Sequence, residues 1–543
     1  MKYLKRVILI ISIVVLCLIT SWFILRKYYL NELVHSSIEE NLCNYIENDF
    51  HFSFDKVNIN LISSKVKFSG LNLYFFNYAD TVGYFKGDMS IHIQGWRNML
   101  FDEQIVIKSI GLKEVDAYYA QNYPLKINNK NEENEQELEI FNVSAAGKLH
   151  YAEHHKQQNG KVTSNFNINI SLNYDSKQEF NVANLVSAIN QFEVTDFHYF
   201  LPDGFYQIQI TELGFSEFSN INLKQVVVNP VDSKKAFALK KKVATDFISF
   251  SADSIQLKGF DNQIDRRIYI DQIQMFQPNF DVFKDKNFPE DLEYTAILVD
   301  LLKDIEIPIY IRTTEVQSMY IKYSELADQA QEAGDLFFSD ANAKISNITN
   351  VKDSLKISGN MLIEAEAKFF GVGMLKTTMR YKIISTSGQF DIRGSLGSMD
   401  ILEVNSIVSK LVPVKVKSGQ LDDLRFNFSG TRTHSEGEMW FEYSDLNIKV
   451  LESDFLNSSF TREIISGLGN IVIKNSNPSS NGVLRVGKIS QDRIVHKSMF
   501  NYWWISLQSG FLSSVGVKAK KEKINNKTGE TATLKDKLGL GEK

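Results

Sequence analysis

The stretch VNINLISSKVKFSGLNLYFFN, residues 57–77, decides the fold class. Apolar side chains recur in it at every second residue, which is the period of a β-strand with one buried face. These residues are Val57, Ile59, Leu61, Val66, Phe68, Leu71, Leu73 and Phe75. Serine and glycine separate the runs, and both residue types favour turns. The stretch therefore predicts short β-strands in antiparallel succession.

The same alternation returns along most of the chain and predicts a strand-rich body. It recurs at residues 89–93, 105–107, 115–119, 166–172, 206–210, 268–270, 307–311 and 415–450. A theme of strand, polar turn and strand ending in an aromatic residue appears three times. Its copies are IVIKSIGLKEVDAYY, IYIDQIQMFQPNFDVF and IPIYIRTTEVQSMYIKY. Because the copies are unevenly spaced, they favour one sheet extended by similar units over a strict solenoid.

Composition indicates a folded protein without a nucleic-acid partner. The 543 residues are 43% apolar and 23% charged, which is typical of globular chains. The formal net charge of -5 is small for this length, so no broad field points to nucleic acid. The two cysteines, Cys17 and Cys43, exclude a structural disulfide framework, because Cys17 lies inside an apolar N-terminal run.

That N-terminal run predicts a membrane anchor. Residues 7–25 read VILIISIVVLCLITSWFIL and carry no charge. At a helical rise of about 1.5 Å per residue they span roughly 28 Å, close to the hydrocarbon thickness of a bilayer. Lys2, Lys5 and Arg6 precede the run and favour a cytoplasmic N-terminus. The run is long for a signal peptide and has no small-residue cleavage site, so we expect an uncleaved signal anchor.

The rest of the chain divides where its pattern changes. The polar stretch NNKNEENEQELE (residues 128–139) predicts a surface loop. Residues 291–304 and 399–411 have helical periodicity, the second with Ser398 as N-cap and Pro413 after its end. The predicted parts are an anchor (1–27), an N-terminal strand domain (28–127), the acidic loop (128–139), an extended β-sheet body (140–397), a closing segment (398–517) and a Lys-rich tail (518–543).

The two ends of the chain carry motifs that resemble a known family. The closing segment contains SGQLDDLRFNFSGT (residues 418–431) and GEMWFEYSDLNIKVL (residues 437–451), and RIVHKSMFNYWWISLQSG (residues 493–510) ends it. With the anchor and the strands of residues 57–119, these resemble the AsmA-like superfamily, including TamB relatives and Bacteroidetes members of unknown function. The residues on the family pattern are Gly419, Leu421, Leu424, Phe426, Phe428, Gly430, Gly437, Tyr443 and Leu446.

The resemblance implies an elongated, curved antiparallel sheet, shaped like a half-pipe, whose apolar groove holds lipid acyl chains. It also implies an inner-membrane protein of a Gram-negative-type cell, single-pass with its body in the periplasm, that holds or transfers phospholipid in outer-membrane and envelope biogenesis. Because acyl chains need only apolar contacts, such a function requires no fixed polar residues. The alternative is a non-enzymatic envelope scaffold that recruits protein partners through a closed β-sandwich, which would show the same alternation.

Two short motifs resemble known catalytic or phosphate-binding patterns. His150, Glu153 and His154 match the inverted zinc-peptidase pattern H-x-x-E-H, which needs a helix to place both histidines on one metal. Their flanks predict a strand and a polar hairpin, so we expect no zinc. GVLRVGK (residues 482–488) lacks the Ser or Thr of a phosphate-binding loop and predicts a strand. We therefore expect no catalytic residue, cofactor or metal, and no enzyme.

The aromatic segment around Trp503 and Trp504 leaves two interpretations. Tryptophan followed by lysines is typical of a membrane interface. A terminal helix that packs over the end of the sheet fits the same residues, and we favour it.

Overall fold

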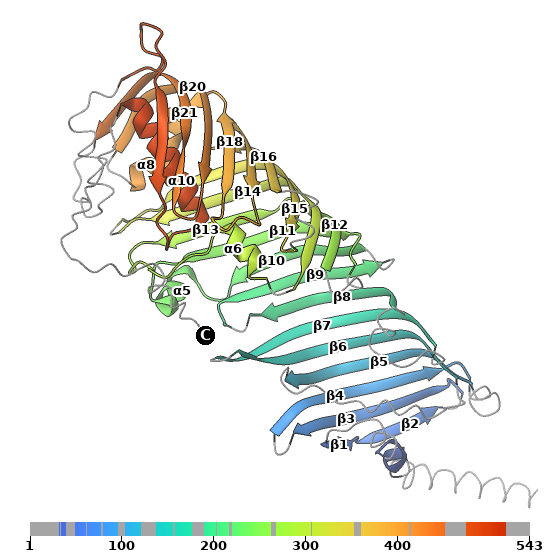
Figure 1. The fold of residues 1–543 in the computed structure, drawn as a ribbon. Helices are drawn as coiled ribbons and strands as arrows, with labels where there is room; N and C mark the ends of the chain where they lie inside the picture. The colour runs from blue at the N-terminus through green and yellow to red at the C-terminus, as the bar shows by residue number, and fades with distance from the viewer. Residues whose placement is uncertain are drawn as a thin grey trace, which may run out of the picture.

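The computed structural model shows a mainly β protein built on one long sheet of 22 strands (Figure 1). A few helices accompany the sheet, most of them near its C-terminal end. The described residues are 32, 34–39, 49–60, 62–77, 80–95, 104–120, 137–155, 158–175, 189–201, 203–216, 220–261, 268–305, 307–328, 330–351, 360–411, 414–450 and 474–516.

The strands follow one another along the whole described chain. In order they are β1 (Asp49–Ser53), β2 (Lys56–Asn60), β3 (Lys65–Asn77), β4 (Asp80–Ile93), β5 (Gln104–Ala120), β6 (Glu137–His155), β7 (Gln158–Asp175), β8 (Ile189–Phe200), β9 (Tyr206–Ser216), β10 (Asn220–Pro230), β11 (Asp246–Lys258), β12 (Ile268–Phe276), β13 (Asn279–Asp285), β14 (Ile309–Leu326), β15 (Gly334–Thr349), β16 (Met361–Phe369), β17 (Gly373–Tyr381), β18 (Phe390–Leu396), β19 (Met399–Asp400), β20 (Val414–Gly430), β21 (His434–Val450) and β22 (Val486–Asp492). The helices with printed bounds are α5 (Lys234–Lys241), α6 (Leu298–Lys303), η1 (Ile401–Val404), α8 (Asn405–Leu411) and α10 (Met499–Val515).

Most strands pair antiparallel with the strand that follows them in the sequence. Three pairings are parallel instead: β5 with β6, β12 with β14 and β13 with β14. The prediction of a wholly antiparallel sheet is therefore wrong at these places. A parallel pair needs a connection that carries the chain back to the same end of the sheet. Residues 121–136 and 286–308 provide connections of sufficient length.

The stretch at residues 57–77 contributes to β2 and β3. The predicted turn at Ser69 and Gly70, however, does not form. β3 continues through Ser69 and Gly70, and its register against β4 shifts between Phe68 and Leu71. Gly70 has a φ of +61°, which glycine adopts without strain. The extra residue is a β-bulge, and it leaves both Phe68 and Leu71 buried.

Both predicted helices of the C-terminal half begin later than expected. Within residues 291–304 only α6, Leu298–Lys303, is helical. The backbone N–H of Thr295 donates to the carbonyl of Val495 at 3.0 Å, and this contact with a distant segment replaces a helical turn. Within residues 399–411, Met399–Asp400 pairs with β20 before η1 and α8 follow. Asp400 caps η1, so the prediction of Ser398 as N-cap is wrong.

Buried side chains gather in two clusters at opposite ends of the sheet. The N-terminal cluster comprises Phe52, Val57, Phe68 and Leu71, with Val34 and Ile38 of a short helical segment packed on it. The larger C-terminal cluster lies among β16–β22, α6 and α10. Its fully buried aromatic residues include Tyr381, Phe390, Phe428, Tyr443 and Tyr502. The closing segment and the elements α6 and β16–β18 before it therefore share the main core.

Several predictions fall on residues outside the described ranges. These are the anchor at residues 1–27, most of the acidic loop at residues 128–139 and the tail at residues 518–543. The last three residues of the predicted loop belong to β6, which begins at Glu137, so the loop prediction is wrong there. Among the described residues no helix is long and apolar enough to cross a membrane.

Candidate functional site

The pairing of the strands aligns apolar side chains into one row that crosses the entire sheet. Residues that pair across neighbouring strands project to the same face. Starting at β2 and ending at β22, the paired residues are Ile59, Val66, Ile91, Ile110, Val143, Ile170, Phe192, Phe215, Ile221, Leu257, Ile273, Thr314, Ile345, Ile363, Met379, Ile392, Phe428, Gly437 and Ile489. We call this set the apolar row; all but two of its members are large hydrophobic residues.

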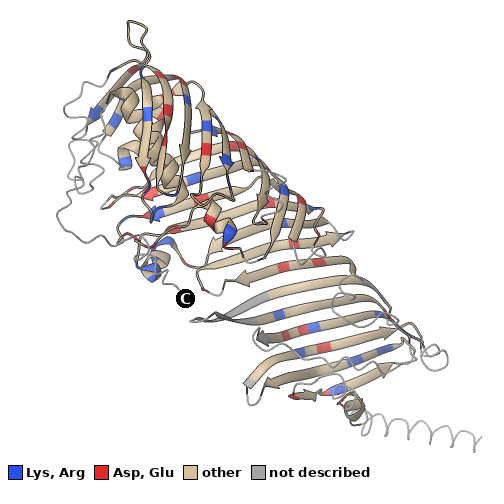
Figure 2. Cartoon of the chain, viewed as in Figure 1, with Lys and Arg blue, Asp and Glu red and all other residues tan. Residues whose placement is uncertain are grey.

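The residues beside the apolar row form a second row of opposite character. Successive residues of a strand point to opposite faces, so this polar row lies on the other face. Its members are Asn58, Lys67, Ser90, Gly111, Ser144, Asn169, Glu193, Gly214, Asn222, Gln256, Gln274, Glu315, Lys344, Glu364, Thr378, Arg393, Asn427, Glu438 and Lys488. Every member is polar or glycine, and Figure 2 shows charged residues of both signs distributed along the strands. The sheet is therefore amphipathic from end to end.

Neighbouring positions widen the apolar row into an apolar face. On β7, Phe166 and Ile168 lie on the same side as Ile170, while Asn165, Asn167 and Asn169 alternate with them and are exposed. The alternation is interrupted once within β8–β11, where the register skips Asp196 (φ +55°) and Gln225 (φ +51°), so the apolar residues beyond this line continue the face at the opposite parity. There, Ile208 pairs with Val228, and Ile210 pairs with Val226. On β11 and β13, Ile248 pairs with Val282, and Phe250 pairs with Phe280. We define the apolar face as the apolar-row side of β5–β13.

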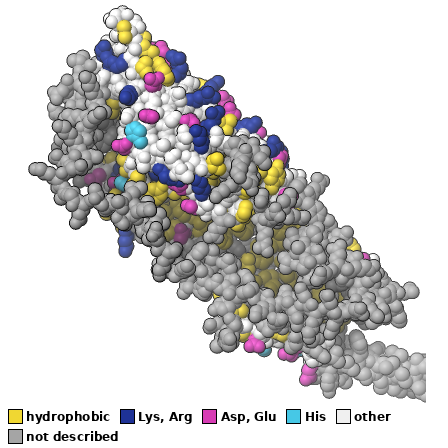
Figure 3. All heavy atoms as spheres, in the orientation of Figure 1, with side chains coloured by type: hydrophobic (Ala, Val, Ile, Leu, Met, Phe, Trp, Pro, Cys, Tyr) yellow, Lys and Arg dark blue, Asp and Glu magenta, His cyan; other side chains and the backbone are white. Residues whose placement is uncertain are grey.

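The apolar face is not covered by a second layer of described residues. Neither buried cluster contains a residue of β5–β13. Most apolar-face side chains, Ile170 and Phe192 among them, are only half-buried. Figure 3 shows hydrophobic side chains in the recessed middle of the molecule. All described strands belong to one sheet, so they do not form the two packed sheets of a β-sandwich.

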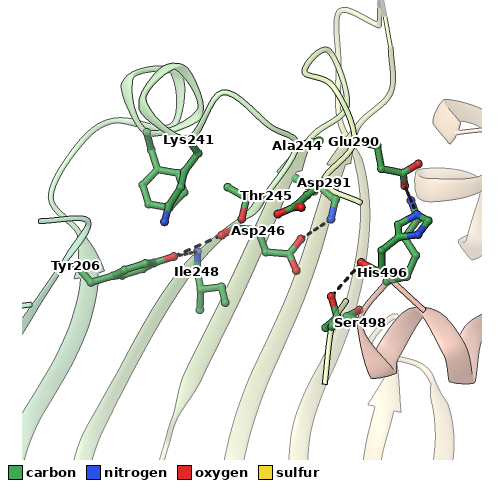
Figure 4. A pocket seen from close by; sticks show the side chains of 14 residues that line it. Tyr206, Lys241, Ala244, Thr245, Asp246, Ile248, Glu290, Asp291, His496 and Ser498 are labelled. Carbon is green, nitrogen blue, oxygen red and sulfur yellow. Dashed lines mark hydrogen bonds and ion pairs between the residues drawn. The ribbon is translucent and has the colours of Figure 1, made fainter. Parts of the chain in front are cut away.

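A polar pocket lies at the edge of this face, where the strand ends meet the segment before α10. Its volume is about 340 Å³. Tyr206 of β9, Asp246 and Ile248 of β11 and Lys284 of β13 line it from the sheet (Figure 4). Further lining residues come from outside the sheet: Phe237 and Lys241 of α5, then Ala244, Thr245, Glu290, Asp291, Thr295, His496, Lys497 and Ser498. The pocket thus joins segments from three distant parts of the sequence.

Hydrogen bonds and ion pairs fix the walls of the pocket. The Tyr206 hydroxyl lies 3.4 Å from both the carbonyl oxygen of Asp246 and the backbone nitrogen of Ile248; it donates to the first and accepts from the second. Burial raises the pKa of Tyr206, so this hydroxyl stays protonated. The Lys284 ammonium lies 3.1 Å from the Asp246 carboxylate. Across the pocket, Glu290 contacts Lys497 and lies 3.5 Å from Nε2 of His496.

The H-x-x-E-H motif lies in strand β6. Residues 150–154 belong to this strand, in which neighbouring residues alternate between faces. Nε2 of His150 lies 3.1 Å from Oδ1 of Asp116 on β5. No group of three potential metal ligands occurs among the described residues. The other motif, residues 482–488, leads into β22, with Gly482 in a turn at a φ of +77°.

The aromatic segment near the C-terminus forms α10, which packs on β21 and β22. Its Gly510 approaches so closely that an ideal Cβ there would lie 2.9 Å from Cγ1 of Ile489. Trp503 packs against the C-terminal cluster, whereas Trp504 is 46% exposed. The interpretation as a terminal helix packed over the sheet is confirmed.

Sequence reasoning did not find the pocket. The available signal was the run KKAFALKKK at residues 234–242, in which Phe237 alone is aromatic. Nothing in the sequence shows that α5 lies near Lys284 or Lys497, because contacts between distant segments depend on the sheet register. Comparison with protein-family models, curated protein sequences and solved structures found no match.

Proposed function

We propose that this chain is an AsmA-like protein that holds or transfers phospholipid, with acyl chains lying on the apolar face of β5–β13. In this proposal residues 1–27 anchor it in the inner membrane, the body lies in the periplasm as a curved groove, and the lipid serves outer-membrane biogenesis. The apolar row carries the proposal, because it continues across the eight strands β5–β12, which no described layer covers.

The energetics favour an acyl chain as the occupant of this face. Removing apolar surface from water contributes about 0.8 kcal/mol per CH2 group, so a long chain gains most from an extended apolar surface. A soluble protein rarely leaves an apolar patch of this extent facing water. The polar row would remain hydrated while the apolar row contacts lipid. A phospholipid also matches the charge-lined pocket, since it combines apolar chains with a charged headgroup.

A photocrosslinking residue at two adjacent positions tests the proposal in the full chain. Ile170 belongs to the apolar row and Asn169 to the polar row, so their side chains lie on opposite faces of β7. We expect p-benzoylphenylalanine at Ile170 to crosslink radiolabelled phospholipid in living cells. The same group at Asn169 is the matched control and should give at most a trace. Phe192 and Glu193 on β8 repeat the comparison.

Two outcomes would overturn the proposal. Equal lipid labelling at both positions would mean that the apolar face has no preference for lipid. Crosslinks from Ile170 to a protein in place of lipid would support a non-enzymatic scaffold that recruits partners through this face.

A further inference from the structure

The polar pocket lies directly beside the apolar face. Ile248 lines the pocket and also pairs with Val282 on the apolar face. Asp246 and Lys284 pair with each other two positions further along the same strands, so they lie on that face as well. The apolar surface of β11 and β13 therefore ends in charged side chains. An elongated amphiphile on this face would bring its polar end to the pocket.

Three ammonium groups from separate elements surround the pocket. Lys241 belongs to α5, Lys284 to β13 and Lys497 to the segment before α10. Burial, together with the nearby ammonium groups of Lys286 and Lys284, lowers the pKa of the Lys497 ammonium to about 8. The pocket also holds the carboxylates of Asp246, Glu290 and Asp291, so the position that favours an anion is the one beside a lysine without an ion-pair partner.

Lys241 is available to such an anion. Its ammonium lies 3.5 Å from the ring centroid of Phe205 and 6.0 Å from that of Phe237. Among the described residues no carboxylate forms an ion pair with it, whereas Lys284 and Lys497 are paired with Asp246 and Glu290. Figure 4 shows the Lys241 side chain extending from α5 toward Tyr206. Aromatic contacts thus position a cation at the pocket without neutralising it.

We infer that the pocket binds the phosphate of a phospholipid headgroup, with Lys241 as its principal cation and Lys284 and Lys497 beside it. The inference rests on the proposed function, because it places the acyl chains on the apolar face. The hydroxyls of Thr245 and Ser498 also line the pocket and can donate to phosphate oxygens. The carboxylates of Asp246, Glu290 and Asp291 provide acceptors for a headgroup alcohol or amine. A phospholipid headgroup would therefore contact the donors through its phosphate oxygens and the carboxylates through its alcohol or amine.

Titration of the purified full chain with two fluorescent lipids of identical acyl chains tests the inference. Phosphatidic acid carries the phosphate and diacylglycerol lacks it. We expect the wild type to bind phosphatidic acid about tenfold more tightly, the effect of one charge-assisted contact. Lys241→Gln should remove most of this preference and leave diacylglycerol binding unchanged. Lys258→Gln is the matched control, because Lys258 is exposed and hydrogen-bonds Gln274.

A second variant guards against a folding defect. Asp246→Asn combined with Lys284→Gln removes both partners of an ion pair, so no unpaired charge remains. Because it keeps Lys241, this variant should retain most of the preference, with an unchanged thermal unfolding midpoint; its loss would refute Lys241 as the principal cation.

The outcomes separate this inference from the proposed function. If wild type binds both lipids equally, or if Lys241→Gln keeps the preference, the headgroup site is refuted while the lipid-holding face stands. If inorganic phosphate binds as tightly as phosphatidic acid, the pocket is a free-phosphate site and the headgroup assignment is refuted. If neither lipid binds to the folded chain, the proposed function itself fails.

Discussion

Alanine substitutions at Phe390 and Gly430, alone and together, test how tightly the C-terminal cluster is packed. The two residues pair across β18 and β20, and Phe390 is fully buried. An ideal Cβ at Gly430 would lie 2.2 Å from Cζ of the Phe390 ring. Gly430→Ala should therefore force the ring to move and cost about 1–3 kcal/mol of unfolding free energy. Phe390→Ala removes a buried aromatic ring and should cost about 3–5 kcal/mol.

The double variant carries the decisive comparison. With the ring absent, the new methyl group enters vacated space, so the combined loss should be at least about 1 kcal/mol smaller than the sum of the single losses. Urea unfolding followed by tryptophan fluorescence measures all three, because Trp440 and Trp503 lie in this part of the chain. Gly214→Ala is a control, since nothing lies within 4 Å of its Cβ position. Strictly additive losses would refute the reasoning.

Two further predictions concern an ion pair of α6 and the N-terminal anchor. Burial raises the pKa of Asp300, but the Arg432 guanidinium outweighs it and holds that pKa below its usual range. Asp300→Asn should cost about 1–3 kcal/mol in urea unfolding at pH 7. This cost should fade as pH falls below about 4, because the unfolded wild type takes up the proton first and the folded wild type follows at a lower pH. A cost independent of pH contradicts the assignment. Replacing residues 1–27 by a cleavable signal peptide should move the body from the membrane pellet to the soluble periplasmic fraction, and continued sedimentation with membranes would disprove the anchor.

The sequence was most informative where one local rule sufficed. Period-two alternation predicts β-strands, and Val57, Ile59, Val66 and Phe68 all lie on strands of the described sheet. The rule does not say which neighbour each residue meets. A shift of one residue, such as the bulge at Gly70, changes the face of every following side chain. The apolar row could therefore be seen only after the registers were known.

Predictions that depended on distant contacts were the least accurate. Residues 291–297 have helical periodicity, yet Thr295 bonds to the segment before α10, about two hundred positions away. Tertiary hydrogen bonds outweighed helix propensity there, because propensity differences amount to only a few tenths of a kcal/mol per residue. The pocket also depends on contacts between distant segments, since Lys241 and Lys497 come together only in the folded chain.

The nearly sequential pairing of the strands has a consequence for how the protein acquires its structure. Each strand can join its predecessor as soon as it is synthesised, so the sheet can grow from the N-terminus by addition at one edge. That growing edge exposes unpaired backbone groups until the next strand arrives. Growth ends at β22, where α10 packs on the last strands and completes the core. The growing sheet can therefore pair with a wrong strand until α10, the last described helix, has packed on β21 and β22.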